Sequence, residues 1–260
     1  MNRVALVSGA ARGIGATTAT LLATQGWYVL ALDIAADDPA LPYRLGTKAE
    51  LAAVAASAPD RIHPFIADVR DLDALESAVA EAEHRWGGVD AAVAAAGVIA
   101  GGGPQQEVPV EQERAVLDVN LTGVLNLARA TIPAQLRRPA PRSGRFVAVA
   151  SAAATRGLPN LAAYCAAKAG VAGFVRALAV ELGETGVTVN AVSPGSTDSA
   201  ILAESARLYA LDDVADFAVQ HPIRRLVQPA EVAAAIAFLL GPNAGAITGA
   251  VLPVDGGMAL

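Results

Sequence analysis

Hydrophobic positions along the 260-residue chain form two kinds of segment that alternate from one end to the other. Seven apolar runs have the length of strands, at residues 4–7, 28–32, 62–66, 91–95, 146–150, 187–192 and 250–254. Both faces of these runs are apolar, which is typical of strands covered by helices on either side. Helical spacing separates them, near residues 14–25, 71–86, 110–137, 160–183 and 229–240.

Such an alternation predicts an α/β fold. Repeated strand–helix units form a parallel sheet with right-handed crossovers, so we expect a doubly wound open sheet with helices on both faces. A closed barrel needs eight strands and usually a longer chain. No repeat, charge block or linker divides the sequence, and we expect a single domain over 1–260.

Two segments interrupt the alternation. Residues 35–61 are lengthened, and Pro39 and Pro42 exclude a helix over 35–46, so a helix is expected only at 47–57. Residues 196–228 follow the sixth predicted strand and contain a short predicted helix at 199–209. Loops at the carboxyl ends of parallel strands commonly carry function, so both segments are candidates for a site.

Composition limits the function classes. The chain is 54% hydrophobic and 17% charged, with a formal net charge of −6. No uncharged apolar run reaches the about 18 residues of a membrane span, and the acidity argues against nucleic acid as a partner. The lone Cys165 cannot form an internal disulfide, so we expect a cytoplasmic protein. The three histidines, at 63, 84 and 221, lack the spacing of metal ligands, and no metal is expected.

A glycine-rich turn links the first predicted strand to the first helix. It runs from Gly9 through Arg12, Gly13 and Ile14 to Gly15. Gly9 permits the tight turn, Gly13 lets the backbone approach a pyrophosphate, and Gly15 permits close packing of helix on strand. Free N–H groups at the helix N-terminus favour an anion. The strand–turn–helix context therefore favours a dinucleotide site over a plain glycine turn.

Two carboxylates bear on which nucleotide is bound. Asp33 closes the second predicted strand, 18 residues after Gly15, where a carboxylate accepts both adenosine ribose hydroxyls and repels a 2′-phosphate. We therefore expect NAD rather than NADP, with Arg12 as the counter-argument because it could reach a phosphate. Asp68 either contacts the adenine or caps the helix that begins near Asp71, and the residues alone leave this open.

A candidate catalytic group lies in the second half of the chain. Tyr164 and Lys168 are four residues apart and share one face of a predicted helix. A lysine ammonium lowers the pKa of a neighbouring tyrosine from about 10, so the pair can exchange a proton with a carbinol or carbonyl oxygen. Ser151 ends the fifth predicted strand and can hydrogen-bond the same oxygen. This set favours an enzyme over a non-catalytic nucleotide-sensing or scaffolding protein on the same fold.

These motifs, in this order, resemble the classical short-chain dehydrogenase/reductase family from residue 3 to the end. Further matching pieces are Asp68-Val69, Asn120 within Asp-Val-Asn-Leu-Thr-Gly, the run from Asn190 to Pro194 and Gly195, and the terminal Val254-Asp-Gly-Gly257. The resemblance implies one Rossmann domain with seven parallel strands in the order 3-2-1-4-5-6-7. It also implies hydride transfer between nicotinamide and a carbinol or carbonyl carbon, in a homotetramer.

The resemblance also implies a role for each matching residue. Tyr164 is the general acid/base, Lys168 binds the nicotinamide ribose, Ser151 polarises the reacting oxygen, and Asn120 holds a water in a proton relay. The implied cofactor contacts, beyond the turn at 9–15 and Asp33, come from Asp68, Val69, Ala96, Gly97, Tyr164, Lys168, Pro194, Gly195, Thr197 and Ser199.

One motif departs from the family pattern. Ala94-Ala95-Ala96-Gly97 replaces the usual Asn-Asn-Ala-Gly, so the asparagine side chains that brace neighbouring strands are missing, and we expect lower local rigidity. This variant and the segment 35–61 are similar to actinobacterial members linked to the redox cofactor mycofactocin. That similarity implies NAD held beneath the insertion and re-oxidised by a separate carrier. The alternative is an exchangeable NAD under a longer surface loop.

The substrate is indicated only by class. Apolar residues in the segment 196–228 favour a small hydrophobic secondary alcohol or ketone. The alternative within the family is an NADPH-dependent 3-oxoacyl-thioester reductase, which Asp33 disfavours.

Overall fold

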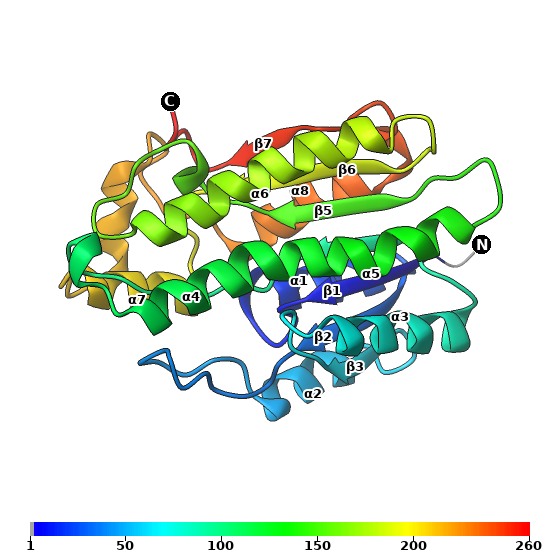
Figure 1. The fold of residues 1–260 in the computed structure, drawn as a ribbon, viewed down its shortest axis with the longest axis horizontal. Coiled ribbons are helices and arrows are strands. Elements are labelled where there is room, and N and C mark those ends of the chain that lie inside the picture. Colours follow the sequence, from blue (N-terminus) through cyan, green and yellow to red (C-terminus); the bar gives the residue numbers. More distant parts are fainter. Residues whose placement is uncertain (1–2) are drawn as a thin grey trace.

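A seven-stranded parallel sheet runs through the centre of the protein in the order β3-β2-β1-β4-β5-β6-β7 (Figure 1). The computed structural model describes residues 3–260. The strands are β1 (Val4–Ser8), β2 (Tyr28–Asp33), β3 (Ile62–Ile66), β4 (Ala91–Ala94), β5 (Arg145–Val149), β6 (Thr188–Pro194) and β7 (Val251–Val254). Every pairing between neighbours is parallel. The predicted fold class and strand order are confirmed.

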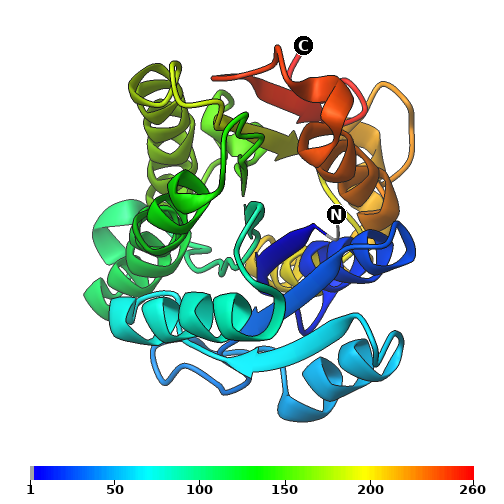
Figure 2. The same ribbon diagram turned by 90° about the vertical axis from the view of Figure 1, so that its right-hand side faces the viewer.

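Helices cover both faces of this sheet (Figure 2). They are α1 (Gly13–Thr24), α2 (Lys48–Ala56), α3 (Leu72–Trp86), α4 (Val110–Leu117), α5 (Gly123–Arg137), α6 (Ala162–Glu181), α7 (Ala200–Leu208) and α8 (Pro229–Leu240). One buried core joins α3, α5 and α6 to the sheet, and a second joins α1, α2 and α8 to its other face. The sheet is thus doubly wound, as the alternating pattern predicts.

The two edge strands depart from the prediction that every strand is buried on both faces. In β3 Ile66 is 53% exposed, and in β7 Leu252 is 36% exposed. Each edge strand has a neighbour on one side only. Both edge strands contain a proline, Pro64 and Pro253, which edges tolerate because one side needs no ladder hydrogen bonds.

The predicted helix at 110–137 is interrupted. A π-helical turn, Asp118–Thr122, separates α4 from α5. Asn120 lies in this turn, fully buried, and its side-chain amide donates to the carbonyl of Val116 at 2.9 Å. A wider turn of this kind is common at functional sites because it redirects side chains within a helix.

The segment predicted as a loop at 35–46 folds against the rest of the protein. Leu41 and Leu45 are buried in a small apolar cluster with Val98 and Val116. The helix predicted at 47–57 is α2, whose N-terminus is capped by Thr47 in a reciprocal capping box. Residues 35–46, called the insertion from here on, are therefore a packed part of the structure.

One helix has an apolar character that needs an explanation. Within residues 3–260, α6 alone is long and apolar enough to cross a membrane by length and composition. Its residues Val171 and Val175 are fully buried in the core that joins α6 to the sheet. Packing within the protein therefore accounts for the apolar face of this helix.

Candidate active site

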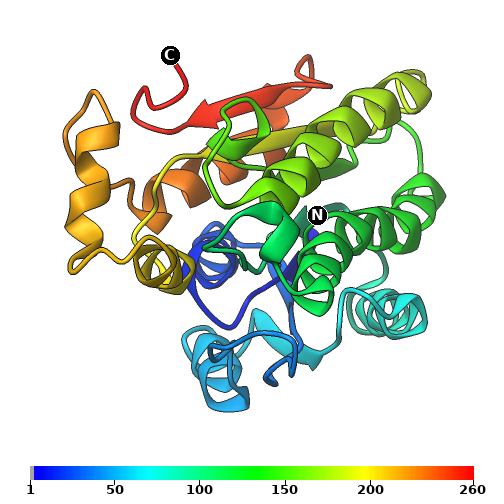
Figure 3. The same cartoon turned by 60° about the vertical axis from the view of Figure 1, so that its left-hand side comes forward.

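A cavity of about 630 Å³ lies at the carboxyl ends of the strands. It is bounded on one side by α7 and by the 3-10 helix Val214–Gln220, which stand beyond the end of the sheet (Figure 3). All eighteen residues that the sequence proposed for catalysis or cofactor binding line it: Gly9, Arg12, Gly13, Ile14, Gly15, Asp33, Asp68, Val69, Ala96, Gly97, Asn120, Ser151, Tyr164, Lys168, Pro194, Gly195, Thr197 and Ser199.

The turn after β1 leaves no room for side chains. Gly9 has φ +67°, and a Cβ on it would lie 2.7 Å from the backbone of Ala96. A Cβ on Gly15 would lie 2.0 Å from the carbonyl oxygen of Gly9. The N-terminus of α1 has neither a side-chain cap nor an acidic residue in its first turn. Its first N–H groups therefore suit an anionic group such as a pyrophosphate, and this part of the cavity fits a dinucleotide.

The carboxylate of Asp33 is fixed by the backbone. Its oxygens accept from the N–H groups of Ala11 at 3.0 Å and Ala35 at 2.9 Å. Arg12, the residue that could favour a phosphate, donates instead to the carbonyl of Arg44 at 2.9 Å. The guanidinium is therefore turned toward the insertion.

One of the two alternatives for Asp68, the capping of α3, is excluded by its neighbours. Asp71 caps α3 by accepting from the N–H of Ala74 at 3.1 Å, so Asp68 is not the cap. Asp68 instead pairs with Arg70 at 2.6 Å, and Arg70 also pairs with the buried Asp38 at 2.7 Å. These ion pairs connect the end of β3 to the insertion. Sequence reasoning missed Arg70 and Asp38, because no spacing signals a contact across 32 residues.

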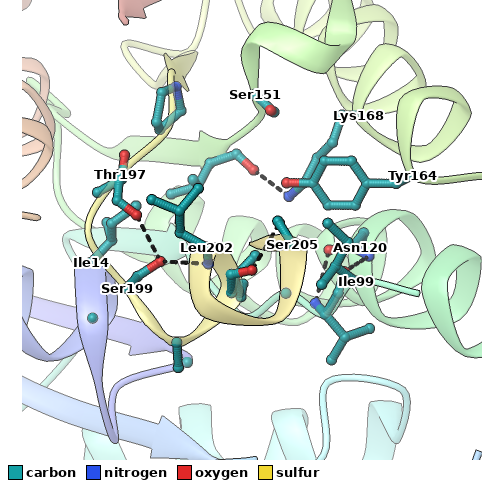
Figure 4. A pocket seen from close by; sticks show the side chains of 18 of the residues that line it. Ile14, Ile99, Asn120, Ser151, Tyr164, Lys168, Thr197, Ser199, Leu202 and Ser205 are labelled. Carbon is teal, nitrogen blue, oxygen red and sulfur yellow. Dashed lines mark hydrogen bonds between the residues drawn. The ribbon is translucent and has the colours of Figure 1, made fainter. Parts of the chain in front are cut away.

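Ser151, Tyr164 and Lys168 converge at one wall of the cavity (Figure 4). Ser151 follows β5, and its hydroxyl accepts from the N–H of Ala153 at 3.1 Å. The ammonium nitrogen of Lys168 donates to the carbonyl of Val149 at 2.8 Å and lies 5.7 Å from the centroid of the Tyr164 ring. The strand end and one face of α6 thus bring the three functional groups together.

The electrostatics of this group differ from the sequence prediction. Burial raises the pKa of Tyr164 above its ordinary value, although the hydroxyl of Ser151 acts in the opposite direction. Burial also lowers the pKa of Lys168 to about 8. The predicted lowering of the tyrosine pKa is therefore wrong for this structure, because loss of solvation outweighs the favourable contacts.

The side chain of Asn120 is largely committed to the backbone. Its amide nitrogen donates to the carbonyls of Val98 at 2.8 Å and Val116 at 2.9 Å, and its oxygen accepts from the N–H of Val98 at 3.2 Å. Only one lone pair of this amide is left for a water. Asn120 therefore braces the loop after β4, whatever its part in a proton relay.

The missing asparagines after β4 are compensated by a serine that sequence reasoning overlooked. The hydroxyl of Ser8 accepts from the N–H groups of Ala95 at 3.1 Å and Ala96 at 3.3 Å. It also donates to the carbonyl of Val93 at 3.3 Å. Since Ser8 ends β1, its hydrogen bonds connect β1 to the end of β4. They take the place of the bracing expected from the missing asparagines.

The remaining wall is largely apolar. Among the apolar residues of the segment 196–228, Leu208 does not line the cavity, whereas five others do: Ile201, Leu202, Tyr209, Leu211 and Phe217. Sequence reasoning missed further lining residues from the loop after β5, from the 3-10 helix Val214–Gln220 and from the chain end, among them Arg156, Leu158, Pro159, Leu161, Gln220 and Met258. Within residues 3–260, no group of three or more His, Cys, Asp or Glu side chains could hold a metal ion.

Comparisons with known proteins agree with this geometry. A family model described as enoyl-(acyl carrier protein) reductase matches residues 9–259. The chain is 38% identical to a cis-4-hydroxycyclohexanecarboxylate dehydrogenase of Sinomonas cyclohexanicum, over 98% of this chain and 96% of that protein. A carveol dehydrogenase structure from Mycobacterium avium in complex with NAD matches with a TM-score of 0.93 and 35% identity, covering 98% of this chain and 97% of that one. An actinorhodin polyketide ketoreductase structure with NADPH matches with a TM-score of 0.88 and 34% identity, covering 99% of this chain and 97% of that one.

Replacing Lys168 with methionine tests the cost of burying the ammonium. Because the pKa of Lys168 falls to about 8 from 10.5, the unfolded chain binds more protons between these values, and wild-type stability rises with pH there. Below pH 8 the full penalty, on the order of 3 kcal/mol, is present. The variant leaves the carbonyl of Val149 without its donor, at about 1 kcal/mol.

We therefore expect Lys168→Met to be about 1–2 kcal/mol more stable than wild type at pH 7, and this advantage to disappear by pH 10. Urea unfolding of both proteins at pH 7 and pH 10 measures the difference. The exposed Lys48 provides the control, because Lys48→Met should leave stability within about 0.5 kcal/mol at both pH values. A Lys168→Met variant less stable than wild type at pH 7 would contradict the assignment of the penalty.

Proposed function

The chain belongs to the short-chain dehydrogenase/reductase family of oxidoreductases, and from this premise we propose that it transfers hydride between a secondary alcohol or ketone and NAD. The observation that carries the proposal is one continuous cavity. It joins the glycine turn before α1 to the hydroxyls of Ser151 and Tyr164 and the ammonium of Lys168. A non-catalytic nucleotide-binding protein on this fold would not need that second group.

The residues around the cavity divide between holding the cofactor and the chemistry. NAD supplies the hydride acceptor when it is bound. The pyrophosphate would be held by the turn at 9–15 and the first N–H groups of α1, and the adenosine ribose by Asp33. Further cofactor contacts are assigned to Asp68, Val69, Ala96, Gly97, Pro194, Gly195, Thr197 and Ser199.

Proton transfer is assigned to Tyr164. Its raised pKa keeps the phenol neutral, which suits donation to a carbonyl oxygen. Acting as a base requires positive charge nearby, and a Lys168 pKa of about 8 leaves most of that side chain as ammonium at pH 7. Ser151 would orient the reacting oxygen, and Asn120 would hold a water on the path from Lys168 to solvent.

We propose NAD rather than NADP as the cofactor. The fixed carboxylate of Asp33 disfavours a 2′-phosphate, and Arg12 is engaged with the carbonyl of Arg44. The second candidate, an NADPH-dependent 3-oxoacyl-thioester reductase, draws on the NADPH-bound ketoreductase among the similar structures. Asp33 weighs against that candidate.

The proposed substrate is a small hydrophobic cyclic alcohol or ketone. The apolar wall from α7 and the following 3-10 helix supports it. So do the relatives, because 4-hydroxycyclohexanecarboxylate and carveol are both cyclic secondary alcohols.

We further propose that NAD is held tightly and re-oxidised by a mycofactocin-type carrier. The insertion lies against the cofactor part of the cavity, and the hydroxyl of its Tyr43 accepts from the N–H of Ile99 at 2.9 Å. Burial raises the pKa of Tyr43 to about 12, so this contact stays neutral. The pairs of Arg70 with Asp38 and Asp68 fasten the other side of the insertion.

We also propose an oligomeric state and a location in the cell. Exposed apolar side chains, Phe238 on α8, Leu252 on β7 and Val180 on α6, support a homotetramer built through these elements. The unpaired Cys165 supports a cytoplasmic location.

Replacing Tyr164 with phenylalanine tests the proposed reaction. Removing the hydroxyl removes the general acid/base, so kcat for oxidation of a cyclic alcohol should fall about 10²- to 10⁴-fold. The Kd for NAD, measured by fluorescence titration, should stay within about threefold, because the ring remains. Tyr28→Phe is the matched control and should retain activity, because it removes a hydroxyl from a ring that is stacked on Trp86 at the start of β2, outside the cavity. Unchanged turnover in Tyr164→Phe would refute the role.

Replacing Asp33 with asparagine tests the cofactor choice. The amide keeps the shape of the side chain but removes the charge that repels a 2′-phosphate. Titration of nucleotide-stripped protein should show the preference for NAD over NADP, as a ratio of Kd values, falling about tenfold or more. Asp60→Asn changes an exposed carboxylate before β3 and should leave the ratio unaltered. A wild-type protein that prefers NADP would overturn the choice.

Retention of NAD tests the role of the insertion. Purified wild-type protein should carry NAD through gel filtration and turn over only with an added electron acceptor. Asp38→Asn weakens the ion pair to Arg70 and should speed NAD release about tenfold. Glu83→Gln, which weakens a surface pair with Arg137, should not. Rapid loss of NAD from the wild type would show an ordinary exchangeable cofactor.

A further inference from the structure

Charged side chains are distributed unevenly along the cavity. At the end formed by β1, β2 and β3, Asp33, Asp38 and Asp68 line it together with Arg12 and Arg70, so carboxylates outnumber guanidiniums there. Toward the apolar wall the charged lining residues are Lys168 and Arg156, with no carboxylate among them. The substrate end of the cavity is therefore positive.

Arg156 differs from the arginine at the opposite end. Arg70 is satisfied by two carboxylates, Asp38 and Asp68. None of the ion pairs formed within the described part of the chain includes Arg156. One of its nitrogens, Nη1, donates to the carbonyl of Met258 at 2.9 Å. This bond orients the guanidinium and leaves most of its five N–H groups available.

Two titratable side chains at this end of the cavity, Asp255 and His221, are engaged with the backbone. Asp255, on the C-terminal segment, uses both carboxylate oxygens to accept from the N–H groups of Gly257 and Ala259. The buried His221 accepts from the N–H of Ser196 at 3.1 Å, and burial lowers the pKa of this imidazole, which keeps it neutral. An anion at this end of the cavity would therefore meet a guanidinium with which no carboxylate of residues 3–260 forms an ion pair.

We propose that Arg156 is a specificity-determining residue that binds a carboxylate carried by the substrate on the far side of its ring from the hydroxyl. The substrate class is thus an alicyclic hydroxy acid. The apolar residues would contact the ring, while Tyr164 and Ser151 would receive the hydroxyl. This inference rests on the proposed dehydrogenase function and narrows its substrate.

The geometry of a guanidinium favours this assignment. Its planar fork matches a carboxylate with two parallel hydrogen bonds, which a neutral amide cannot reproduce. Gln220, which is half-buried, also lines the cavity and has a side-chain amide that can donate to an anion. The exposed position of Arg156 lowers the desolvation cost of the pair but also limits its strength, so the expected effect is moderate.

The test compares two substrates that differ only in charge. We expect the NAD-loaded wild type to oxidise cis-4-hydroxycyclohexanecarboxylate with a kcat/KM about tenfold or more above that for the corresponding carboxamide. In Arg156→Gln the ratio between the two substrates should fall about 10- to 100-fold, and Arg156→Lys should restore part of it. Arg142→Gln is the matched control, because Arg142 is also exposed and donates to a carbonyl at 2.9 Å but lies outside the cavity.

A binding measurement keeps the test independent of turnover. Cyclohexanecarboxylate, which has no hydroxyl, should bind the NAD-loaded wild type more tightly than cyclohexanecarboxamide, and Arg156→Gln should remove the difference. If Arg156→Gln does not fold, the wild-type ratio and Arg156→Lys decide. Equal kcat/KM for acid and amide in the wild type, or an unchanged ratio in Arg156→Gln, would overturn the inference.

Failure of the proposed function has a different signature. A wild type that oxidises cyclohexanol but shows no preference for the acid refutes only the role of Arg156. The dehydrogenase proposal is refuted if the wild type, with every electron acceptor tried, oxidises none of three compounds: cyclohexanol, cis-4-hydroxycyclohexanecarboxylate and the corresponding carboxamide. In that case the inference falls with it.

Discussion

The backbone of Gly9 lies so close to Gly15 and to Ala96 that no side chain fits between them, and the rest of the site depends on this contact. It seats α1 directly on β1 and holds the end of β4 beside them. The order of the sheet reverses between β1 and β4, which is where open parallel sheets form their ligand crevice. Ser8 reinforces the same junction through hydrogen bonds to the loop after β4. The close packing thus keeps open the space that a dinucleotide needs.

Burial of the side chains of Lys168 and Tyr164 in the cavity lowers the stability of the fold. Lys168 is almost fully buried with one hydrogen bond, to the carbonyl of Val149, and burial lowers its pKa. The same loss of solvent raises the pKa of Tyr164. Apolar side chains at positions 164 and 168 would give a larger free energy of unfolding. A neutral phenol beside an ammonium is useful only if a proton must be moved there.

The insertion between β2 and α2 is anchored to the rest of the protein at two places. Its leucines pack beside Val98 and Val116, near the turn that carries Asn120. Its acidic residue Asp38 is buried against Arg70, which follows β3. Because these anchors come from both sides of the cofactor part of the cavity, movement of the insertion requires breaking an apolar cluster and an ion pair together.

The sequence by itself determined the sheet, most of its helices and the candidate residues that line the cavity. Apolar periodicity is a local property, and the glycine turn and the pair Tyr164 and Lys168 lie within single elements, so their spacing could be interpreted directly. Only the tertiary structure decided what depends on contacts between distant segments. It paired Arg70 with Asp38, connected Ser8 to the loop after β4 and brought Arg156 into the lining of the cavity, where burial also raises the pKa of Tyr164. These outcomes follow from solvation and from neighbours far away in the chain, which no local pattern encodes.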